Sequence, residues 1–246
     1  MKSLLKKHLP PAFLDLARKL VNILPLWAVT RKGRWIRTKY SRFGQDQRSF
    51  VFMSIARFLH INRPVPGYYF EFGCKEANTM RKAWDHFSHL FDLTYVGFDS
   101  FQGLPEITQI DKQLIWKKGK LAFAEDRFIK TMRGHGMPAD KLITVKGFYL
   151  DSLTMELKSR LLPTKAAVIY IDCDLYASTV PILEWIIDFL QVGSVIVFDD
   201  WYCFYGDPQR GERLAWNEFR QRHPELCFSE FVRTNEAMSF IYVGRV

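Results

Sequence analysis

The stretch AVIYIDCDLYAST, residues 167–179, guides the interpretation of the rest of the chain. Val168–Ile171 is a short apolar run with β-branched residues, which is typical of a strand buried on both faces of a parallel sheet. Asp172 and Asp174 follow at the point where this strand ends. The spacing of apolar residues then becomes helical, and the Ser-Thr pair at 178–179 is the predicted start of the helix.

A second apolar run, Ser194–Phe198, follows the predicted helix and ends in Asp199 and Asp200. Strand, helix and strand form a βαβ unit, whose crossover is right-handed in nearly all known proteins. Neighbouring parallel strands lie about 4.8 Å apart. We therefore expect Asp172, Asp199 and Asp200 to converge on one edge of the sheet, which is where open α/β sheets bind ligands.

Further strands are predicted on both sides of this unit. Apolar runs predict strands over 68–72, 94–98 and 142–145, with helices between them, the second of which is expected over 121–133. Two final runs, 227–233 and 239–245, predict an antiparallel hairpin at the edge of the sheet. The sequence thus predicts an α/β fold with a doubly wound, mostly parallel seven-stranded sheet and a C-terminal antiparallel hairpin.

Charge divides the chain into two parts. The chain has 246 residues, of which 48% are hydrophobic, enough for one large α/β core. Its net charge of +9 is carried by residues 1–47, whereas the remainder has equal numbers of basic and acidic residues. A basic total can indicate a nucleic-acid partner, but the predicted domain has no excess charge, so we expect none. We predict a basic helical extension over 1–47 and one domain over 48–246.

The extension has two open interpretations. Apolar residues over 13–24 fall at helical spacing, with Lys and Arg off that face. This helix could pack on the domain or on a second subunit in a homodimer. Alternatively, it could lie on an anionic membrane surface, assisted by the basic run 31–42. The apolar piece 21–29 is broken by Pro25 and is too short to span a bilayer, and charged residues argue against a cleaved signal peptide.

The cysteines indicate a reducing compartment. Cys74, Cys173, Cys203 and Cys227 show no metal-ligand spacing. Three of them lie in or beside predicted strands, where a free cysteine behaves as a small hydrophobic side chain. We therefore expect a cytoplasmic protein, with peripheral contact to the inner face of the membrane if the extension binds lipid.

The turn after the first predicted strand favours a nucleoside-like ligand. A dinucleotide fingerprint needs three glycines at fixed offsets, whereas EFGCKEANT, residues 71–79, contains only Gly73. A cofactor gripped through its pyrophosphate is therefore disfavoured. Glu71 and Gly73 suit a nucleoside-like ligand that lacks phosphates. Asp99, at the tip of the second strand, is placed to accept hydrogen bonds from both ribose hydroxyls.

Four other residues could contribute to a site, and for three of them a purely structural role is an alternative. Gly147 permits the close approach of a ligand, and Phe148 could cover the flat face of an adenine or simply pack in the core. Asp174 could support the acidic cluster or cap the following helix. Tyr176 could bound an acceptor pocket or pack against its neighbours.

Four ordered sequence blocks resemble the class I S-adenosylmethionine methyltransferases, and within them the macrocin O-methyltransferase (TylF-type) family. The blocks are D-S-F-x-G-L-P at 99–105, K-G-F-Y-x-D-S-L at 146–153, D-x-D-L-Y-x-S-T at 172–179 and the Asp pair at 199–200. The likeness covers about residues 50–246. It implies a Rossmann-like fold and transfer of a methyl group from S-adenosylmethionine to a hydroxyl of a sugar or glycosylated small-molecule acceptor, with Mg²⁺.

The resemblance also implies roles for individual residues. Asp172, Asp199 and Asp200 would be metal ligands, and we expect Asp172 to serve as general base. The expected cofactor-binding residues are Glu71, Gly73, Thr79, Asp99, Ser100, Gly103, Gly147, Phe148 and Asp172. The first loop departs from the family, because Lys75, Glu76 and Asn78 stand where small residues are usual.

The chemistry of sugar methylation agrees with these residue types. A sugar hydroxyl is a weak nucleophile because its pKa is far above 7, and a bound Mg²⁺ would lower that pKa and fix the hydroxyl. Three carboxylates suit a hard ion, whereas zinc would favour His or thiolate ligands. Two other functions stay open: a catalytically silent binding module at a membrane surface or partner protein, and O-methylation of a small phenol or catechol.

Overall fold

The computed structural model describes residues 31–246, so the expectations for residues 1–30 lie outside the described residues. Contacts within the chain divide it after Gln47, and each unit is described by itself. The described part of the first unit contains α2 (Arg31–Trp35), the π-helical η2 (Ile36–Tyr40) and the beginning of α3 (Ser41–Ile61). Within residues 31–246, no helix has the length and apolar character needed to cross a membrane.

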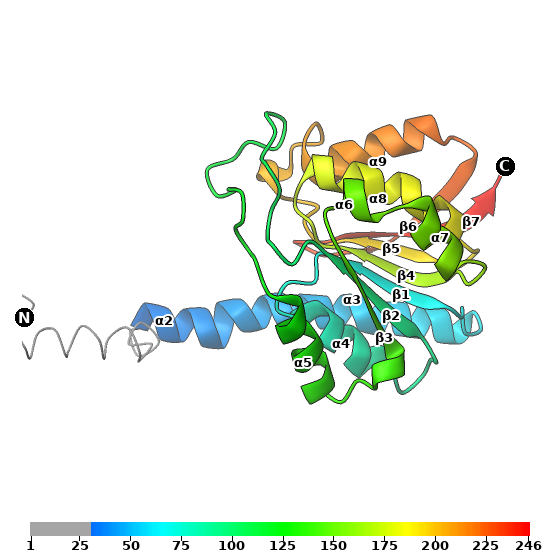
Figure 1. Cartoon of the computed structure of the whole chain (residues 1–246), viewed down its shortest axis with the longest axis horizontal. Helices are drawn as coiled ribbons and strands as arrows, with labels where there is room; N and C mark the ends of the chain where they lie inside the picture. Colours follow the sequence, from blue (N-terminus) through cyan, green and yellow to red (C-terminus); the bar gives the residue numbers. More distant parts are fainter. Residues whose placement is uncertain (1–30) are drawn as a thin grey trace, which may run out of the picture. The chain divides into compact units, whose positions relative to one another are not determined.

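The second unit, residues 48–246, is built on one seven-stranded sheet (Figure 1). The strands run in the order β3-β2-β1-β4-β5-β7-β6; β1 to β5 are parallel, and β7 is antiparallel to β5 and β6. Their bounds are β1 Tyr68–Phe72, β2 Thr94–Asp99, β3 Leu142–Lys146, β4 Ala166–Ile171, β5 Val195–Phe198, β6 Leu226–Arg233 and β7 Met238–Arg245. The predicted fold class is confirmed.

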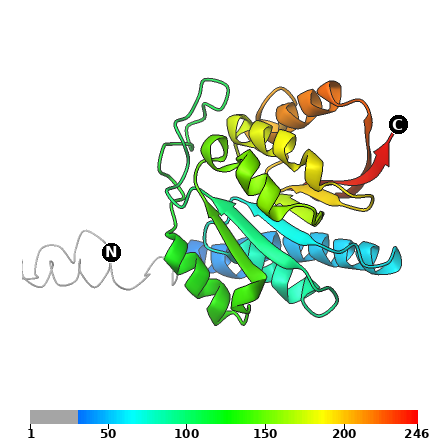
Figure 2. The ribbon, with the colours of Figure 1, turned by 45° about the vertical axis from the view of Figure 1, so that its right-hand side comes forward.

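Helices cover both faces of this sheet (Figures 1 and 2). One face carries α3 with α4 (Asn78–Phe87) and α5 (Glu125–Gly134), and the other carries the helices that follow β3 and the later strands. These are α6 Tyr149–Ser152, α7 Met155–Leu161, α8 Tyr176–Ile186 and α9 Gly211–Arg222. Three short 3₁₀ turns, η3 Ala139–Lys141, η4 Ile187–Phe189 and η5 Phe204–Gly206, complete the elements of this unit.

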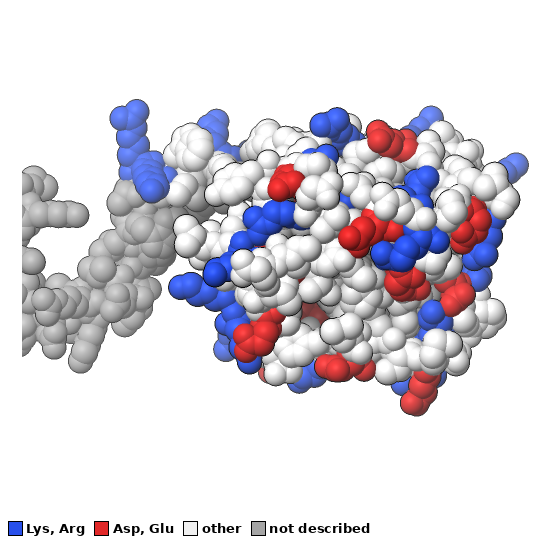
Figure 3. Space-filling model, turned by 90° about the horizontal axis from the view of Figure 1, so that it is seen from above, with Lys and Arg blue, Asp and Glu red and all other residues white. Residues whose placement is uncertain are grey.

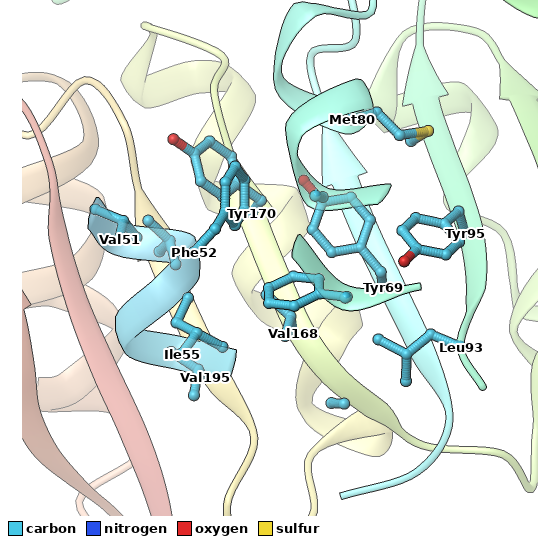
Figure 4. Packing of buried hydrophobic residues seen from close by; sticks show 14 of the residues in the cluster. Val51, Phe52, Ile55, Tyr69, Met80, Leu93, Tyr95, Val168, Tyr170 and Val195 are labelled. Carbon is cyan, nitrogen blue, oxygen red and sulfur yellow. The ribbon is translucent and has the colours of Figure 1, made fainter. Parts of the chain in front are cut away.

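Strand side chains alternate between two buried clusters, one on each face of the sheet. On the α3 face, Phe52 of α3 packs against Tyr69 and Tyr170, with ring centroids 6.3 Å and 5.3 Å apart (Figure 4). In Figure 4 the hydroxyl groups of Tyr69 and Tyr170 point to the same side. Asp172 lies two residues beyond Tyr170, so the alternation of the strand directs it to the α3 face as well.

The even charge balance of this unit is visible on its surface. Figure 3 views the unit from above the orientation of Figure 1 and shows basic and acidic side chains interspersed on that face.

β1 and β4 approach each other closely where both end. Gly73 follows β1 with a φ of +92°, and a Cβ at this position would lie 1.8 Å from the carbonyl oxygen of Asp172. No side chain fits there, so only glycine is compatible with this contact. In the sheet, β1 lies between β2, which follows it in the chain, and β4, which comes later. The contact between β1 and β4 is therefore at the switch point of the sheet, where α/β sheets bind ligands.

Glu71 is buried in β1 with an exposure of 0%. The Tyr69 hydroxyl donates a hydrogen bond to Oε2 of Glu71 at 2.5 Å, whereas no residue within 31–246 forms a hydrogen bond with Oε1. Burial raises the pKa of Glu71 well above its ordinary value, and the hydrogen bond from Tyr69 offsets this only in part. The folded protein therefore favours the neutral, protonated form of this carboxyl group.

A substitution pair tests the contact at Gly73. Gly73 and Gly136 have φ values of +92° and +93°, but a Cβ at Gly136 would meet no atom within 4 Å. We expect Gly136→Ala to lower the free energy of unfolding by about 1 kcal/mol, the cost of the left-handed backbone alone. Gly73→Ala is expected to cost about 3 kcal/mol or more. Equal losses in urea denaturation would contradict the steric explanation.

A second prediction concerns the buried proton on Glu71. A carboxyl group with a higher pKa in the folded than in the unfolded chain binds more protons when folded, so stability falls as the pH rises above the unfolded pKa of about 4.5. Glu71→Gln keeps an oxygen that can accept from Tyr69 but cannot ionise. We expect the wild type to lose more stability than this variant between about pH 5 and pH 8, measured by urea denaturation. The exposed Glu230→Gln serves as control, and parallel profiles for wild type and Glu71→Gln would contradict the prediction.

Candidate active site

A cavity of about 580 Å³ lies at the carboxyl ends of the central strands. Its volume is within the range of small-molecule and cofactor sites. All predicted site residues except Glu71 line this cavity: Gly73, Thr79, Asp99, Ser100, Gly103, Gly147, Phe148, Asp172, Asp199 and Asp200. Glu71 is not a lining residue, because its side chain is enclosed in the core of the α3 face.

Asp99 organises the loop that follows β1. Its Oδ2 accepts hydrogen bonds from the backbone N–H groups of Cys74 at 2.8 Å and Lys75 at 3.1 Å, and its Oδ1 accepts one from Phe101 at 2.7 Å. A carboxylate has about four acceptor sites in all. Asp99 therefore shapes the cavity wall and retains the capacity to accept from a ligand.

The unusual first loop keeps a conformation that normally favours glycine. Lys75 and Ala77 have φ values of 39° and 61°, in the left-handed region that L-residues rarely adopt. Lys75, Glu76 and Asn78 line the cavity. The departure from the family pattern therefore adds charged and polar side chains to the cavity wall.

Other predicted residues build turns at the same wall. The Ser100 hydroxyl donates to the carbonyl oxygen of Gly103 at 2.8 Å and accepts from the backbone N–H of Gln102 at 3.0 Å. The Thr79 hydroxyl lies 3.5 Å from Oδ2 of Asp172. Phe148 is half-buried and lines the cavity, so its ring is accessible to a ligand.

The three acids after β4 and β5 converge as predicted. Asp172, Asp199 and Asp200 each offer a carboxylate oxygen, and these atoms all lie within 4.8 Å of one another. The pKa values of Asp172 and Asp200 are raised well above their ordinary values. Burial is the main cause, and repulsion from the neighbouring acids adds to it. The same causes raise the pKa of Asp174 to about 7. The cluster thus concentrates negative charge in a poorly solvated place.

Arg48 of α3 partly neutralises this charge, and sequence reasoning missed it. Its Nε donates to Oδ1 of Asp199 at 3.3 Å, and its Nη2 donates to Oδ2 of Asp199 and lies 3.7 Å from Oδ2 of Asp172. The Tyr170 hydroxyl also donates to Oδ1 of Asp199. Burial opposes the charge on Arg48, but Asp199 and Asp172 outweigh it and raise the pKa of the guanidinium. No spacing in the sequence links Arg48 to acids more than a hundred positions away.

Asp200 is held from the opposite side of the sheet. Its backbone N–H donates to Oε2 of Glu212 at 3.0 Å, and its Oδ2 accepts from the N–H of Asp174 at 3.0 Å. Glu212 is 1% exposed, and none of the described residues forms a hydrogen bond with its Oε1. Burial, followed by repulsion from Asp200, raises the pKa of Glu212 well above its ordinary value. Glu212 therefore orients the backbone of Asp200.

One cysteine, Cys203, lies beside the acidic cluster. Cys203, Asp174 and Asp200 form a second group whose potential ligand atoms lie within 4.8 Å of one another. The thiol of Cys203 donates to Oδ1 of Asp200 at 3.4 Å. Burial, followed by repulsion from Asp200, raises the pKa of this thiol, so it acts here as a hydrogen-bond donor. The loop after β5 returns Cys203 to the acids, which its spacing in sequence does not reveal.

The start of α8 corrects a second prediction. The helix begins at Tyr176, and its N-cap, Leu175, makes no side-chain cap, so the Ser-Thr pair at 178–179 does not start it and Asp174 does not cap it. Asp111 accepts instead from the N–H groups of Tyr176 at 2.7 Å and Ala177 at 3.1 Å. This cap comes from 65 positions upstream, so local spacing could not predict it.

The loop over 101–124 forms one wall of the cavity and replaces part of a predicted helix. Helix α5 begins at Glu125, whereas a start near Leu121 was expected. The guanidinium of Arg210 donates to the carbonyl oxygens of Ile110 and Lys112, which holds the loop on either side of Asp111. The loop supplies mainly apolar wall residues to the cavity: Leu104, Pro105, Trp116 and Leu121.

Tyr176 fits its packing interpretation. Its hydroxyl donates to Oε2 of Glu218 at 2.7 Å, and its ring packs against the cluster on the α8 face. It is not among the residues that line the cavity.

Solved structures of methyltransferases share this fold. The O-methyltransferase NovP superposes with a TM-score of 0.64 at 21% identity, covering 80% of each chain. CalS11, the calicheamicin methyltransferase, superposes with a TM-score of 0.64 at 19% identity, covering 95% of this chain and 94% of that chain. A structure of apo CalS11, described as a TDP-rhamnose 3'-O-methyltransferase, gives a TM-score of 0.55 at 16% identity, covering 95% and 96%. At these identities the likeness shows the fold.

The sequence itself shows the family. Comparison with curated protein sequences finds no significant match. A family model for macrocin-O-methyltransferase (TylF) matches residues 60–225, well over half of the chain. The cavity at the switch point and its acidic wall lie within the matched region, apart from Arg48. The chain therefore belongs to the TylF macrocin-O-methyltransferase family and is an S-adenosylmethionine-dependent O-methyltransferase.

Proposed function

We propose that the protein transfers a methyl group from S-adenosylmethionine to a hydroxyl of a sugar or glycosylated acceptor, and that it uses Mg²⁺ held by Asp172, Asp199 and Asp200. The observation that carries this proposal is the set of three carboxylate oxygens within 4.8 Å of one another on the wall of the cavity. The macrocin-O-methyltransferase description of the family and the TDP-rhamnose specificity of CalS11 support a sugar-type acceptor.

The donor set fits a hard divalent cation. Mg²⁺ prefers carboxylate and water oxygens over sulfur or nitrogen. Arg48 alone does not offset the repulsion among these carboxylates, which favours a cation. Bound at these residues, Mg²⁺ would supply a Lewis acid that lowers the pKa of the acceptor hydroxyl.

Asp172 is the proposed general base. It lines the cavity, its side chain is 24% exposed, and the Thr79 hydroxyl lies 3.5 Å from its Oδ2. Burial, and to a lesser extent repulsion from the neighbouring acids, raises the pKa of Asp172 in the metal-free protein. We propose that Asp172 accepts the proton of the acceptor hydroxyl.

The cofactor would occupy the part of the cavity next to β1 and β2. We propose that Asp99 accepts a hydrogen bond from a ribose hydroxyl at its remaining acceptor site and that Phe148 covers the adenine. Gly73, Thr79, Ser100, Gly103 and Gly147 would form the surface around it. Glu71 does not line the cavity, so its proposed contribution is to the packing beneath Gly73. S-adenosylmethionine supplies the methyl group when bound.

The cavity wall formed by the 101–124 loop suits an acceptor with an apolar portion. Leu104 and Trp116 line the cavity from the 101–124 loop. Leu150 also lines the cavity and is 83% exposed, and Leu114 of the same loop as Trp116 is 95% exposed. We propose that the sugar hydroxyl enters beside Asp172 while the remainder of the acceptor contacts this loop.

Cofactor binding tests the proposed role of Asp99. Asp99→Asn is expected to weaken S-adenosylmethionine binding by at least about tenfold, equivalent to about 1.4 kcal/mol, because it removes the charged acceptor for the ribose hydroxyl. Isothermal titration calorimetry measures the affinity, with the exposed Asp140→Asn as matched control. Equal affinity for wild type and Asp99→Asn would remove Asp99 from the proposed cofactor site.

Metal dependence is tested by methyl transfer to a panel of glycosides, nucleotide sugars and catechol. We expect EDTA to abolish transfer and Mg²⁺ to restore it, since the uncatalysed hydroxyl is a weak nucleophile. Asp199→Ala is expected to lower turnover by at least about 100-fold while S-adenosylmethionine affinity changes by no more than about threefold. Full transfer in EDTA would exclude the metal, and transfer to catechol alone would exclude the sugar-type acceptor.

A further inference from the structure

The three proposed metal ligands differ in how free their oxygens are. Both oxygens of Asp199 already accept hydrogen bonds, from Arg48 and, at Oδ1, also from the Tyr170 hydroxyl. Asp172 faces the same guanidinium at 3.7 Å. Asp200 does not contact Arg48 in this way; it accepts hydrogen bonds from the N–H of Asp174 and from the thiol of Cys203. A cation that binds all three acids would therefore displace bonds that Arg48 makes.

The position of Arg48 is fixed by the packing of α3. Phe52 lies one turn further along the helix and is fully buried, and its ring centroid is 5.3 Å from that of Tyr170. Residues four positions apart share a face of a helix, so burial of Phe52 directs Arg48 toward the same end of β4. Figure 4 shows Phe52 and Tyr170 in contact on this face. The guanidinium therefore approaches Asp199 from a rigid support.

Arg48 is well placed to act as a counter-ion. Within residues 31–246, it is the only basic residue that forms an ion pair with Asp172 or Asp199. Its side chain is 23% exposed, and that of Asp199 is 5% exposed. A guanidinium and a divalent cation at the same carboxylates would repel each other strongly, because screening by water is weak there.

We propose that Arg48 is an internal counter-ion that competes with the divalent cation for Asp172 and Asp199 and thereby sets the metal affinity of the site. The inference rests on the proposed metal site and names a specificity-determining residue outside the matched family region, which begins at residue 60. Without metal, Arg48 holds the repelling acids together. When metal binds, the guanidinium leaves Asp199, and it returns when the metal dissociates.

Metal titration of the full chain tests this role without any turnover. MnCl₂ is titrated by isothermal titration calorimetry into the protein at one fixed pH, with neither S-adenosylmethionine nor acceptor present. Arg48→Met removes the charge and keeps an unbranched side chain, so we expect its Kd for Mn²⁺ to fall by at least about tenfold relative to wild type. Circular dichroism confirms that each variant is folded.

The control isolates the local effect from the change in net charge. Arg57 is an exposed residue of the same helix, and Arg57→Met removes the same charge without touching the acids. Its Kd is expected to stay within about twofold of wild type, as for an exposed, screened charge. If Arg57→Met tightened Mn²⁺ binding as much as Arg48→Met, the competition at Asp199 would be overturned.

A second variant keeps the test decisive if Arg48→Met does not fold. Arg48→Lys retains the charge, but a single ammonium cannot make the two-pronged bond to Asp199. Its Kd for Mn²⁺ is expected to fall by about threefold or more, between those of wild type and Arg48→Met. Affinities equal to or weaker than wild type in the folded Arg48 variants would overturn the proposal.

The proposed function fails in a different way. If EDTA abolishes methyl transfer but the Arg48 variants bind Mn²⁺ with the same Kd as the wild type, only the proposed competition between Arg48 and the cation is overturned. If transfer proceeds fully in EDTA and no variant binds Mn²⁺, the metal part of the proposed function is overturned together with the competition. S-adenosylmethionine binding, measured separately, distinguishes both results from a protein that has lost its cofactor site.

Discussion

Repulsion among buried carboxylates at the carboxyl end of the sheet is the constraint on which the site depends. Asp172, Asp199 and Asp200 are brought together by three features: β4 and β5 are adjacent and parallel, both strands end in acid, and Gly73 lets β1 meet β4 without a side chain between them. Such a cluster is unfavourable unless protons, hydrogen bonds or a cation compensate it. On one face of the sheet, Arg48 and Tyr170 donate hydrogen bonds to Asp199. On the other face, Glu212 accepts a hydrogen bond from the backbone N–H of Asp200.

Single acidic side chains hold the walls of the cavity in place, because they accept hydrogen bonds from backbone N–H groups that are far away in sequence. Asp99 accepts hydrogen bonds from backbone N–H groups of the first loop, which stabilises Lys75 in its left-handed conformation. Asp111 caps α8, which begins directly after the acids that follow β4. Because each of these carboxylates accepts several hydrogen bonds, loops without regular structure become well-defined walls. The apolar residues of the 101–124 loop are thereby held beside the cofactor region and the acidic cluster.

Much of the fold and part of the site could be predicted from local patterns. Apolar runs such as Val168–Ile171 identified the central strands, and the strand-end rule correctly placed Asp172, Asp199 and Asp200 together. Glu71 shows the limit of that rule, because it lies within β1 and its buried side chain does not line the cavity. The helix start at 178–179 was wrong because local cap residues were considered, whereas the actual cap, Asp111, comes from another loop. Arg48 and Cys203 were missed for the same reason: their partners are neighbours only in space.

The sequence by itself determined the order of strands and helices, the acidic strand ends and the family, because these depend on periodicity and on residue types within a few positions. Only the tertiary structure decided which charges meet. Whether the guanidinium of Arg48 lies at Asp199, whether a thiol reaches Asp200 and whether a distant aspartate caps α8 depend on how helices and loops pack over the sheet. Electrostatic and hydrogen-bond partners are selected by distances of a few ångströms, and such distances between remote segments are set by packing alone.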